Sequence, residues 1–263
     1  MNENILIRPV GAVKSAFLDP NTAQDSEQKA VIEVFLEYAD GLLQIEKNSH
    51  LWILTWFHLA KRDALSTVPY RINPKSPTYG VFALRTPVRP NPVGLSLVRL
   101  DKVDGRMLHV TGMDAVNGTP VIDIKPYFEN DIVFSPLTPF IKPFKREMLQ
   151  KHFLKQALIH HQEECPALLM AVRMAVIASE EFGHLNSPDL YVVVEGSPCL
   201  ADTIQGLSRA RLANPPRYTY CLSDSCGLSK WRRGSKELKI TARRIIDQEA
   251  FEKASDGDIM DIR

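Results

Sequence analysis

The segment that decides the fold of the first half of the chain is Gly80–Leu97, GVFALRTPVRPNPVGLSL. Its prolines at 87, 90 and 92 fix φ at about −65° and push the residue before each of them towards an extended conformation. Apolar residues on both sides predict that the loop is anchored in strands. The segment therefore predicts a stiff loop that presents Arg85, Arg89 and Asn91 to a ligand, although a proline-rich corner with two solvated arginines fits the same pattern.

Short segments with strand character surround this loop. IRPVGAVKSAF, AVIEVF and the buried strand HLWILTWFH precede it. After it come two strands joined at Asp104-Gly105 and another strand behind the turn Asn117-Gly118. In that last strand, alternation predicts that Asp123 and Lys125 share one face while Ile122 and Ile124 share the other. The pattern favours a small antiparallel β-barrel.

Near residue 142 the pattern changes to helices. KPFKREMLQKHFLKQALIHHQEE and CPALLMAVRMAVIASEEFG have helical periodicity, and YVVVE is typical of a buried strand. The predicted class is therefore α+β, with a β-barrel domain at 1–145 and a separate α+β domain at 146–250. The acidic last residues, 251–263, predict a solvated tail.

Composition sets limits on location and partners. A hydrophobic fraction of 44%, a charged fraction of 24% and a net charge of +1 are typical of a soluble globular protein without a general affinity for polyanions. The chain opens without a signal-like segment, and its longest apolar run is interrupted by Arg173, so we expect a cytoplasmic protein with no membrane segment. In that compartment the four cysteines are expected to be thiols or metal ligands.

The motifs HLWILTWFH, GVFALRTPVRPNPVGLSLVRL and GTPVIDIKPY resemble the TrmO-type (TsaA-like) tRNA methyltransferase family. The resemblance covers roughly residues 5–140. Members of that family use S-adenosylmethionine to methylate N6 of threonylcarbamoyladenosine next to the anticodon. Their fold is a small β-barrel, distinct from Rossmann-like methyltransferases, and the cofactor binds at a dimer interface. The resemblance thus implies S-adenosylmethionine as cofactor, tRNA as substrate and a homodimer.

The resemblance also implies which residues act. Cofactor contacts are expected after the buried strand, around the proline loop and at the last turn: His58, Leu59, Arg85, Leu95, Gly118, Thr119, Pro120 and Val121. On the substrate side it implies Arg89, Asn91, Asp123, Lys125 and Tyr127. The family's Pro-Arg-Gln run is replaced here by Thr22-Ala23-Gln24, of which Gln24 is expected to keep part of the cofactor contact.

The chemistry of this reaction requires alignment more than activation. The sulfonium methyl group is already electrophilic, so the enzyme mainly has to align it with the acceptor nitrogen. A carbamoylated exocyclic nitrogen needs its proton removed, which makes Asp123 or Tyr127 a candidate base. Asp123 and Lys125 also fit a simple surface ion pair, and His58 fits an ordinary histidine at a strand end. Trp52 and Trp56 are expected in the core.

Residues 159–207 carry a weaker resemblance to the FmdE domain, named for the E subunit of formylmethanofuran dehydrogenase. It rests on His161 with Cys165-Pro166 and on Glu195-x-x-x-Cys199-x-x-Asp202-x-Ile204-Gln205. The usual His-Gly-His-x-Cys-Pro run is degraded, because Gln162 and Glu163 replace its glycine and second histidine.

The cysteines of this region suggest a zinc site. Cys165 and Cys199 each begin a predicted helix, which favours the thiolate, and Cys221-x4-Cys226 has a chelating spacing. Cys165, Cys199, Cys221 and Cys226, or three of them with His161, would complete a tetrahedral shell. Plain buried cysteines are the alternative.

The most basic part of the chain is WRRGSK at 231–236 together with Arg209, Arg211 and Arg217. It predicts a tRNA-facing extension, with merely solvated side chains as the alternative. The interpretation is an S-adenosylmethionine-dependent N6-methyltransferase acting on threonylcarbamoyladenosine in tRNA. Two rivals stay open: a non-catalytic sensor or adaptor that binds S-adenosylmethionine or metal, and a small-molecule methyltransferase on the same fold.

Overall fold

The computed structural model describes residues 5–19 and 28–263, so the contact expected of Gln24 lies outside the described residues. The described chain divides into two compact units. The first runs up to Val68 and continues over Pro77–Ile132, and the second comprises Pro69–Ser76 and Val133–Arg263. The change of unit thus falls at residue 133 rather than at the predicted 145. The reason is that Ser135 and Pro136 hydrogen-bond to Arg209 and Asn186 of the second unit, both at 2.7 Å.

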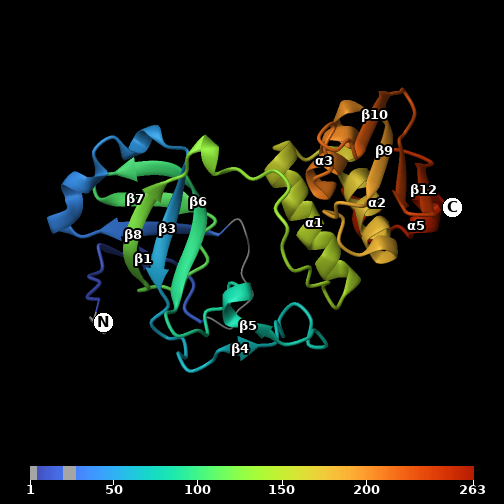
Figure 1. Ribbon diagram of the computed structural model, residues 1–263. Coiled ribbons are helices and arrows are strands. Elements are labelled where there is room, and N and C mark those ends of the chain that lie inside the picture. Colours follow the sequence, from blue (N-terminus) through green and yellow to red (C-terminus); the bar gives the residue numbers. More distant parts are fainter. Residues whose placement is uncertain (1–4, 20–27) are drawn as a thin grey trace. The chain divides into compact units, whose positions relative to one another are not determined.

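The first unit is a closed barrel of six strands among the described residues, in the order β1-β2-β7-β6-β3-β8 (Figure 1). All neighbouring pairs are antiparallel, which confirms the predicted barrel. The barrel strands are β1 (Gly11–Lys14), β2 (Lys29–Val34), β3 (His50–Trp56), β6 (Val93–Asp104), β7 (Met107–Thr111) and β8 (Pro120–Pro126). A small side sheet pairs β4 (Ser66–Thr67) with β5 (Tyr79–Gly80), and four 3-10 turns complete the unit: η1 (Leu36–Leu42), η2 (Ile45–Lys47), η3 (Val81–Ala83) and η4 (Glu129–Asp131).

Strict alternation along β3 decides which of its side chains enter the core. Leu51, Ile53 and Thr55 are buried inside the barrel, so the two tryptophans between and after them point outwards. Trp52 lies against Tyr127 at 5.8 Å between ring centroids, and Trp56 lies under the Arg62 guanidinium at 5.0 Å. The expectation that Trp52 and Trp56 belong to the core was therefore wrong.

The alternation in β8 is interrupted where it pairs with β3. A register shift between Leu54 and Thr55 leaves one extra residue on β8. As a result Val121 and Ile124 both pack against the barrel core, three residues apart rather than two. Asp123 lies between them and stays half-exposed.

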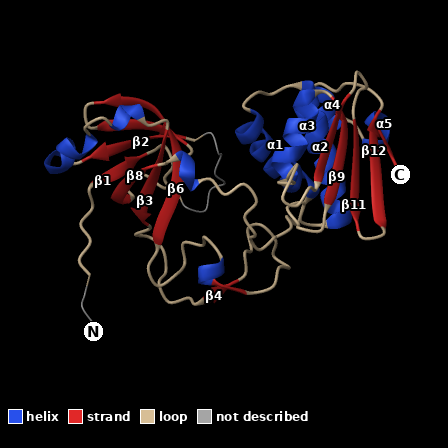
Figure 2. Cartoon of the chain, turned by 45° about the horizontal axis from the view of Figure 1, so that its top comes forward, coloured by secondary structure: helices blue, strands red, loops and turns tan. Residues whose placement is uncertain are grey.

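The second unit is a five-stranded sheet with helices on one face (Figure 2). Its strand order is β10-β9-β11-β12-β13, in which only the β10/β9 pair is parallel. The helices are α1 (Arg146–His161), α2 (Pro166–Phe182), α3 (Pro198–Ser208), α4 (Gln248–Lys253) and α5 (Asp256–Ile259), and the strands are β9 (Tyr191–Gly196), β10 (Tyr218–Leu222), β11 (Leu228–Arg233), β12 (Lys236–Ala242) and β13 (Met260–Ile262).

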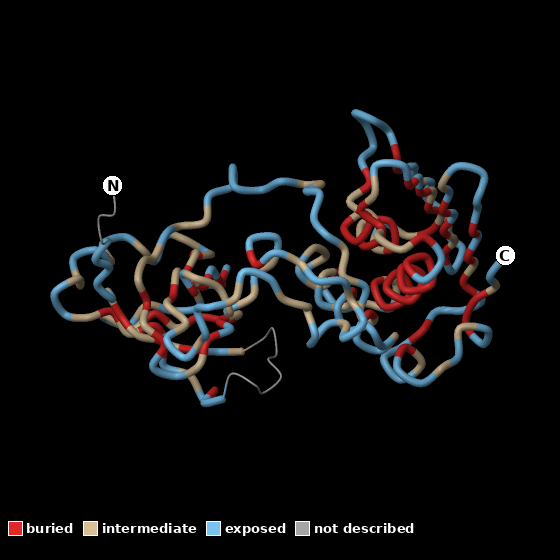
Figure 3. Tube along the Cα trace, turned by 60° about the horizontal axis from the view of Figure 1, so that its bottom comes forward, coloured by how far each residue is buried: buried red, intermediate tan, exposed pale blue. Residues whose placement is uncertain are grey.

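Helix α2 is the centre of this unit, and nearly all of it is buried (Figure 3). It includes Arg173, the charged residue that interrupts the apolar run, and this residue is only 3% exposed. Its guanidinium donates to Asp256 Oδ1 at 2.5 Å and to the carbonyls of Phe251 and Ala254 at 2.8 and 2.9 Å. No helix in the described part of the chain combines the length and the apolar character that a bilayer crossing requires.

These bonds explain why the predicted solvated tail at 251–263 was wrong. The segment folds as the end of α4, α5 and β13, and Phe251, Ile259 and Met260 are at most 3% exposed. A buried guanidinium needs carboxylate and carbonyl partners, and the acidic C-terminal segment supplies them. The acidic composition therefore partly reflects internal pairing.

Candidate cofactor rim and metal-ligand cluster

Antiparallel pairing brings most of the predicted cofactor residues to one end of the barrel. Strand β3 pairs with β6 on one side and β8 on the other, so the end of β3 meets the starts of both neighbours. Leu54 lies opposite Leu95 on β6 and opposite Asp123 on β8. The Phe57 amide donates to the carbonyl of Pro92 at 2.9 Å, which joins the proline loop to the same end. We call this region, residues 57–59, 91–95 and 118–123, the rim.

The side chains of the rim differ in what they can offer a ligand. His58, Leu59, Asn91 and Leu95 are exposed, and so is Arg85 on the loop that precedes it. Thr119 and Val121 are at most 1% exposed, because the first donates its hydroxyl to the Val116 carbonyl at 2.7 Å and the second belongs to the barrel core. Their carbonyls accept from the amides of Val13 and Val10, so neither of these two residues is open to a cofactor. Gly118 has φ +78°, which a residue with a side chain rarely adopts, and Pro120 is half-exposed.

Arg89 is turned back onto its own loop. Its Nε donates to the carbonyl of Thr86 at 2.8 Å, and Nη2 donates to the carbonyls of Val81, at 2.5 Å, and Leu84. These bonds tie η3 to the RPNP turn. Arg89 thus braces its own loop, and the predicted contact of this residue with the substrate stays a prediction, while Arg85 is exposed.

The predicted substrate residues separate into two groups. Asp123 lies at the rim; its carboxylate accepts from the Ile124 amide at 2.9 Å and pairs with Lys125 Nζ at 2.7 Å. Tyr127 lies four residues further on, about 13 Å along the strand, where its amide bonds to His50 at the start of β3. The geometry therefore places Asp123 among the cofactor residues and Tyr127 away from them. The structure contains the Asp123–Lys125 ion pair, which the sequence offered as an alternative to a role in the reaction.

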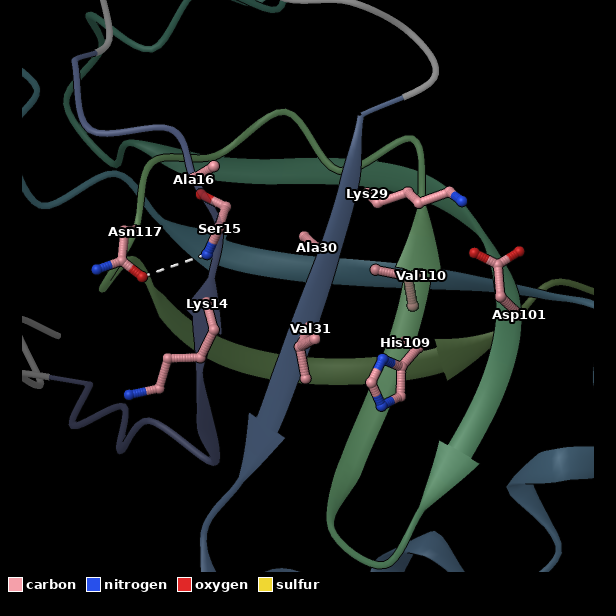
Figure 4. A pocket seen from close by; sticks show the side chains of 10 residues that line it. All are labelled: Lys14, Ser15, Ala16, Lys29, Ala30, Val31, Asp101, His109, Val110 and Asn117. Atoms are coloured by element: carbon pink, nitrogen blue, oxygen red, sulfur yellow. Dashed lines mark hydrogen bonds between the residues drawn. The ribbon is translucent and has the colours of Figure 1, made fainter.

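A hollow of about 370 Å³ occupies the other half of the barrel, over β1, β2 and β7. Figure 4 shows Lys14, Lys29, His109, Asp101 and Asn117 around it. Burial alone would raise the pKa of Asp101, but hydrogen bonds from Thr111 and Arg99 outweigh it and lower that pKa, which keeps the carboxylate ionised beside Lys29. None of the predicted cofactor residues lines this hollow.

In the second unit, three potential metal ligands converge from three helices. They are His161 at the end of α1, Cys165 at the N-cap of α2 and Cys199 in the first turn of α3, and their ligand atoms lie within 4.8 Å of one another. The Cys165 sulfur is 3.6 Å from His161 Nε2 and accepts from the Leu168 amide at 3.4 Å.

An acidic residue orients this cluster. Asp202, one turn beyond Cys199 on α3, has its Oδ2 2.7 Å from His161 Nδ1 and its Oδ1 3.2 Å from His160 Nε2. The spacing of three residues between Cys199 and Asp202 is a sequence signal for a shared helix face, but nothing marked His160 beforehand. A Cβ at Gly206 would lie 2.3 Å from the His160 ring, so glycine is needed for this helix contact.

Two of the four predicted metal ligands lie outside this cluster. Cys221 and Cys226 are exposed and do not belong to the group, which corrects the expected four-thiol site to one histidine and two cysteines. The helix start also fails to favour a thiolate at Cys199: burial first, and then the neighbouring Cys165, raise the pKa of its thiol.

Comparison with known proteins agrees with this division. The model of the tRNA-methyltransferase O N-terminal domain matches residues 13–131, and the model of FmdE, from the molybdenum formylmethanofuran dehydrogenase operon, matches residues 160–242. A relative from Methanothermobacter thermautotrophicus, named "Probable S-adenosyl-L-methionine-binding protein", is 46% identical over 130 residues, which are 48% of this chain and 92% of the relative. The chain belongs to the TrmO family.

The chain spans less than two thirds of the length of two other relatives. A relative from Archaeoglobus fulgidus with the same name is 37% identical over 221 residues, which cover 80% of this chain and 60% of the relative. The human protein named tRNA (adenine(37)-N6)-methyltransferase is 38% identical over 154 residues, which cover 52% of this chain and 34% of that protein. The crystal structure of TrmO from Pseudomonas aeruginosa is 25% identical, with a TM-score of 0.45 over 58% of this chain and 75% of that one.

Proposed function

We propose that the barrel binds S-adenosylmethionine at the rim and transfers its methyl group to N6 of threonylcarbamoyladenosine in tRNA. One observation carries the proposal. An exposed turn that contains Gly118, the exposed Leu95 and a braced proline loop lie together at one end of a TrmO-family barrel. The name of the human relative, a tRNA (adenine(37)-N6)-methyltransferase, supports the reaction class.

The residues of the rim suit the parts of this cofactor. The exposed Arg85 guanidinium can pair with the carboxylate of the methionine moiety, for which its planar fork is well shaped. Leu59 and Leu95, 62% and 45% exposed, offer apolar surface to the adenosine. The Arg89 brace keeps the loop in one conformation, and holding donor and acceptor in line contributes up to about 7–11 kcal/mol in favourable systems.

Asp123 is the proposed proton acceptor at the acceptor nitrogen. It is half-exposed at the rim, and its carboxylate lies 2.7 Å from Lys125 Nζ. Tyr127 serves as the comparison, because it lies about 13 Å further along β8. Asp123→Asn should lower the single-turnover rate while Tyr127→Phe should leave it unchanged; equal rates for both variants and wild type would remove Asp123 from the chemistry.

The activity is tested with purified protein, S-adenosylmethionine and two tRNA preparations, one carrying threonylcarbamoyladenosine and one unmodified. Mass spectrometry of the digested nucleosides should find a methylated product only with the modified tRNA. Methylation of plain adenosine would correct the acceptor. Cofactor binding with neither tRNA methylated would support the sensor or small-molecule alternatives instead.

The proposed enzyme is a homodimer that keeps an apolar wall of the barrel out of water. Leu95 and Leu97 are 45% and 40% exposed on β6, and they lie opposite Leu54 and Trp52 of β3. Such a row of apolar side chains beside the cofactor rim is typical of an interface. Sedimentation should give a dimer for the wild type and a monomer for Leu97→Glu; a monomeric wild type would refute the dimer.

A second function is proposed for the other unit, namely zinc binding by His161, Cys165 and Cys199. Tetrahedral zinc with its usual bond lengths separates a sulfur and a nitrogen ligand by about 3.5 Å, and the Cys165–His161 distance is 3.6 Å. Asp202 at His161 Nδ1 leaves Nε2 for the metal, an arrangement common around zinc-bound histidines. The described cluster supplies three ligands, which leaves a fourth position for water or substrate.

Elemental analysis of the purified protein tests the zinc site. One equivalent of zinc is expected, and Cys165→Ser with Cys199→Ser should lose it, while Cys221→Ser with Cys226→Ser should keep it. A wild type that contains no zinc after purification and does not take it up on addition would refute the site.

A further inference from the structure

The sheet of the second unit has one face that none of the described helices covers. Helices α2 and α3 pack on the opposite face, and α1 packs against these two helices, as Figure 2 shows. Alternation along the strands makes the division sharp: Val192, Val194, Trp231, Leu238 and Ile240 are buried towards the helices.

The residues between these buried positions form the uncovered face and, apart from Val193, are polar, charged or aromatic. Lys230 of β11 stands opposite Val193 of β9 on one side and Lys239 of β12 on the other. In the next row, Arg232 stands opposite Tyr191 and Glu237. We call this surface, made by residues 191, 193, 219, 230, 232, 237 and 239, the open face.

The open face is hollowed and has a cationic rim. A hollow of about 370 Å³ is lined by exposed Lys230, Arg232 and Lys239, and Glu237 is the carboxylate among its lining residues. Glu195, the next outward-facing residue of β9, pairs with Lys230 Nζ at 3.7 Å. Three cations of this surface thus face two carboxylates. The surface therefore keeps an excess of positive charge.

An aromatic ring lies within this basic surface. Tyr191 is 39% exposed, and the Arg232 guanidinium lies 4.8 Å from its ring centroid. A tyrosine ring and a guanidinium plane are the two groups on which proteins stack unpaired bases, and open antiparallel sheets carry such groups in several RNA-binding modules. Ammonium groups on adjacent strands suit the phosphates between stacked bases.

Other arginines that the sequence singled out have internal partners. Arg217 is 6% exposed and donates to the carbonyls of Ser187, Leu190 and Arg209. Arg233 donates to the carbonyls of Phe182 and His184 and pairs with Asp189 at 3.1 Å. Lys236 pairs with Glu181 at 2.5 Å. Among residues 231–236, Arg232 is therefore the cation that joins the two lysines of the open face.

From this arrangement we infer that the open face binds a single-stranded stretch of RNA, with Tyr191 and Arg232 stacking on bases and Lys230 and Lys239 contacting phosphates. The inference rests on the proposed function for the identity of the RNA, and it deepens that proposal by assigning a substrate-binding role to the second unit. The neighbouring positive charges and the exposed ring favour RNA over a second, equally basic copy of the same face.

The test uses the full-length protein, labelled tRNA and a labelled single-stranded oligoribonucleotide, with fluorescence anisotropy over a series of salt concentrations. Lys230→Ala with Lys239→Ala removes two charges from the open face. Lys151→Ala with Lys155→Ala removes two exposed lysines from α1 on the helical side and is the matched control. Melting temperatures verify that both variants fold.

The open-face variant should bind both RNAs more weakly, and the slope of log K against log salt should fall by about 1.4, or about 0.7 for each lost phosphate contact. Tyr191→Ala should weaken binding by roughly fivefold to 100-fold, whereas Tyr191→Phe should bind like wild type. Affinity and slope equal to those of the helical-side control would overturn the inference. A change in sedimentation behaviour with unchanged RNA affinity would also overturn it, in favour of contact between copies.

Methylation kinetics separate this inference from the proposed function. The open-face variant should raise KM for tRNA and keep kcat, because the rim is intact. If the wild type methylates tRNA and the open-face variant has the same KM for tRNA as the helical-side control, RNA binding by the open face is refuted and the proposed reaction stands. RNA binding that depends on the open face, without methylation of any tRNA, would refute the proposed reaction alone.

Discussion

Replacing Arg89 tests whether the stiffness of the proline loop serves cofactor binding. The side chain donates to three carbonyls of its own loop, those of Val81, Leu84 and Thr86. We assign about 1 kcal/mol to each bond, near the middle of the usual net range for a hydrogen bond. The brace then contributes about 3 kcal/mol to the ordered loop, and Arg89→Ala should weaken S-adenosylmethionine binding by up to about 100-fold.

Calorimetry measures the affinity for the cofactor, and hydrogen exchange over residues 81–93 measures how well the loop is ordered. Arg89→Lys keeps the charge but not the fork, so it should resemble Arg89→Ala. Arg244→Ala, which removes an exposed arginine from the other unit, should bind like wild type. Faster exchange in the loop with unchanged affinity would show that the loop is not part of the cofactor site. Unchanged exchange would refute the brace itself.

Three further predictions concern the second unit. Gly206→Ala should destabilise it by about 1–3 kcal/mol, because the added Cβ would lie 2.3 Å from the His160 ring; a melting temperature equal to wild type would contradict this packing. Asp202→Asn should weaken zinc binding about 10-fold to 100-fold in a competition titration, and unchanged affinity would show that the carboxylate does not orient the ligand histidine. Burial and then Arg233 lower the pKa of His184, so the unfolded chain takes up the proton first and stability should fall as pH drops below about 6.5, the ordinary value. His184→Phe should reduce that pH dependence in denaturant titrations, while His152, whose pKa burial also lowers, keeps the remainder. An unchanged dependence would assign it to His152 or another group.

The barrel could be predicted because its signals are local. Turns at Asp104-Gly105 and Asn117-Gly118, together with alternating apolar residues, determine where β6, β7 and β8 begin and end. The position of the rim also follows, since an antiparallel neighbour on each side of β3 must bring its end to their starts. What alternation alone could not decide was which face of β3 is internal, because tryptophan and leucine occupy one face and leucine, isoleucine and threonine the other.

The misplaced features depend on contacts between distant parts of the chain. Nothing near Arg89 indicates that its partners would be the carbonyls of its own loop, and nothing near Arg173 identifies Asp256, 83 residues later, as its counter-ion. For the same reason, two of the four predicted cysteine ligands, Cys165 and Cys199, belong to the cluster and the other two do not. His161, Cys165 and Cys199 meet because three helix ends meet. Cys221 lies on the edge strand β10 and Cys226 in the loop that follows it, which their close spacing in sequence did not reveal.

The central claim is that the methyl donor lies at the end of the barrel where β3 stops and β6 and β8 start. A crystal structure of the protein with S-adenosylhomocysteine, the demethylated product, tests it most directly. We expect the ligand to contact Leu95 and the Gly118 turn, with its carboxylate at Arg85. A ligand bound instead in the hollow beside Lys14 and Lys29, on the other half of the barrel, would contradict the claim.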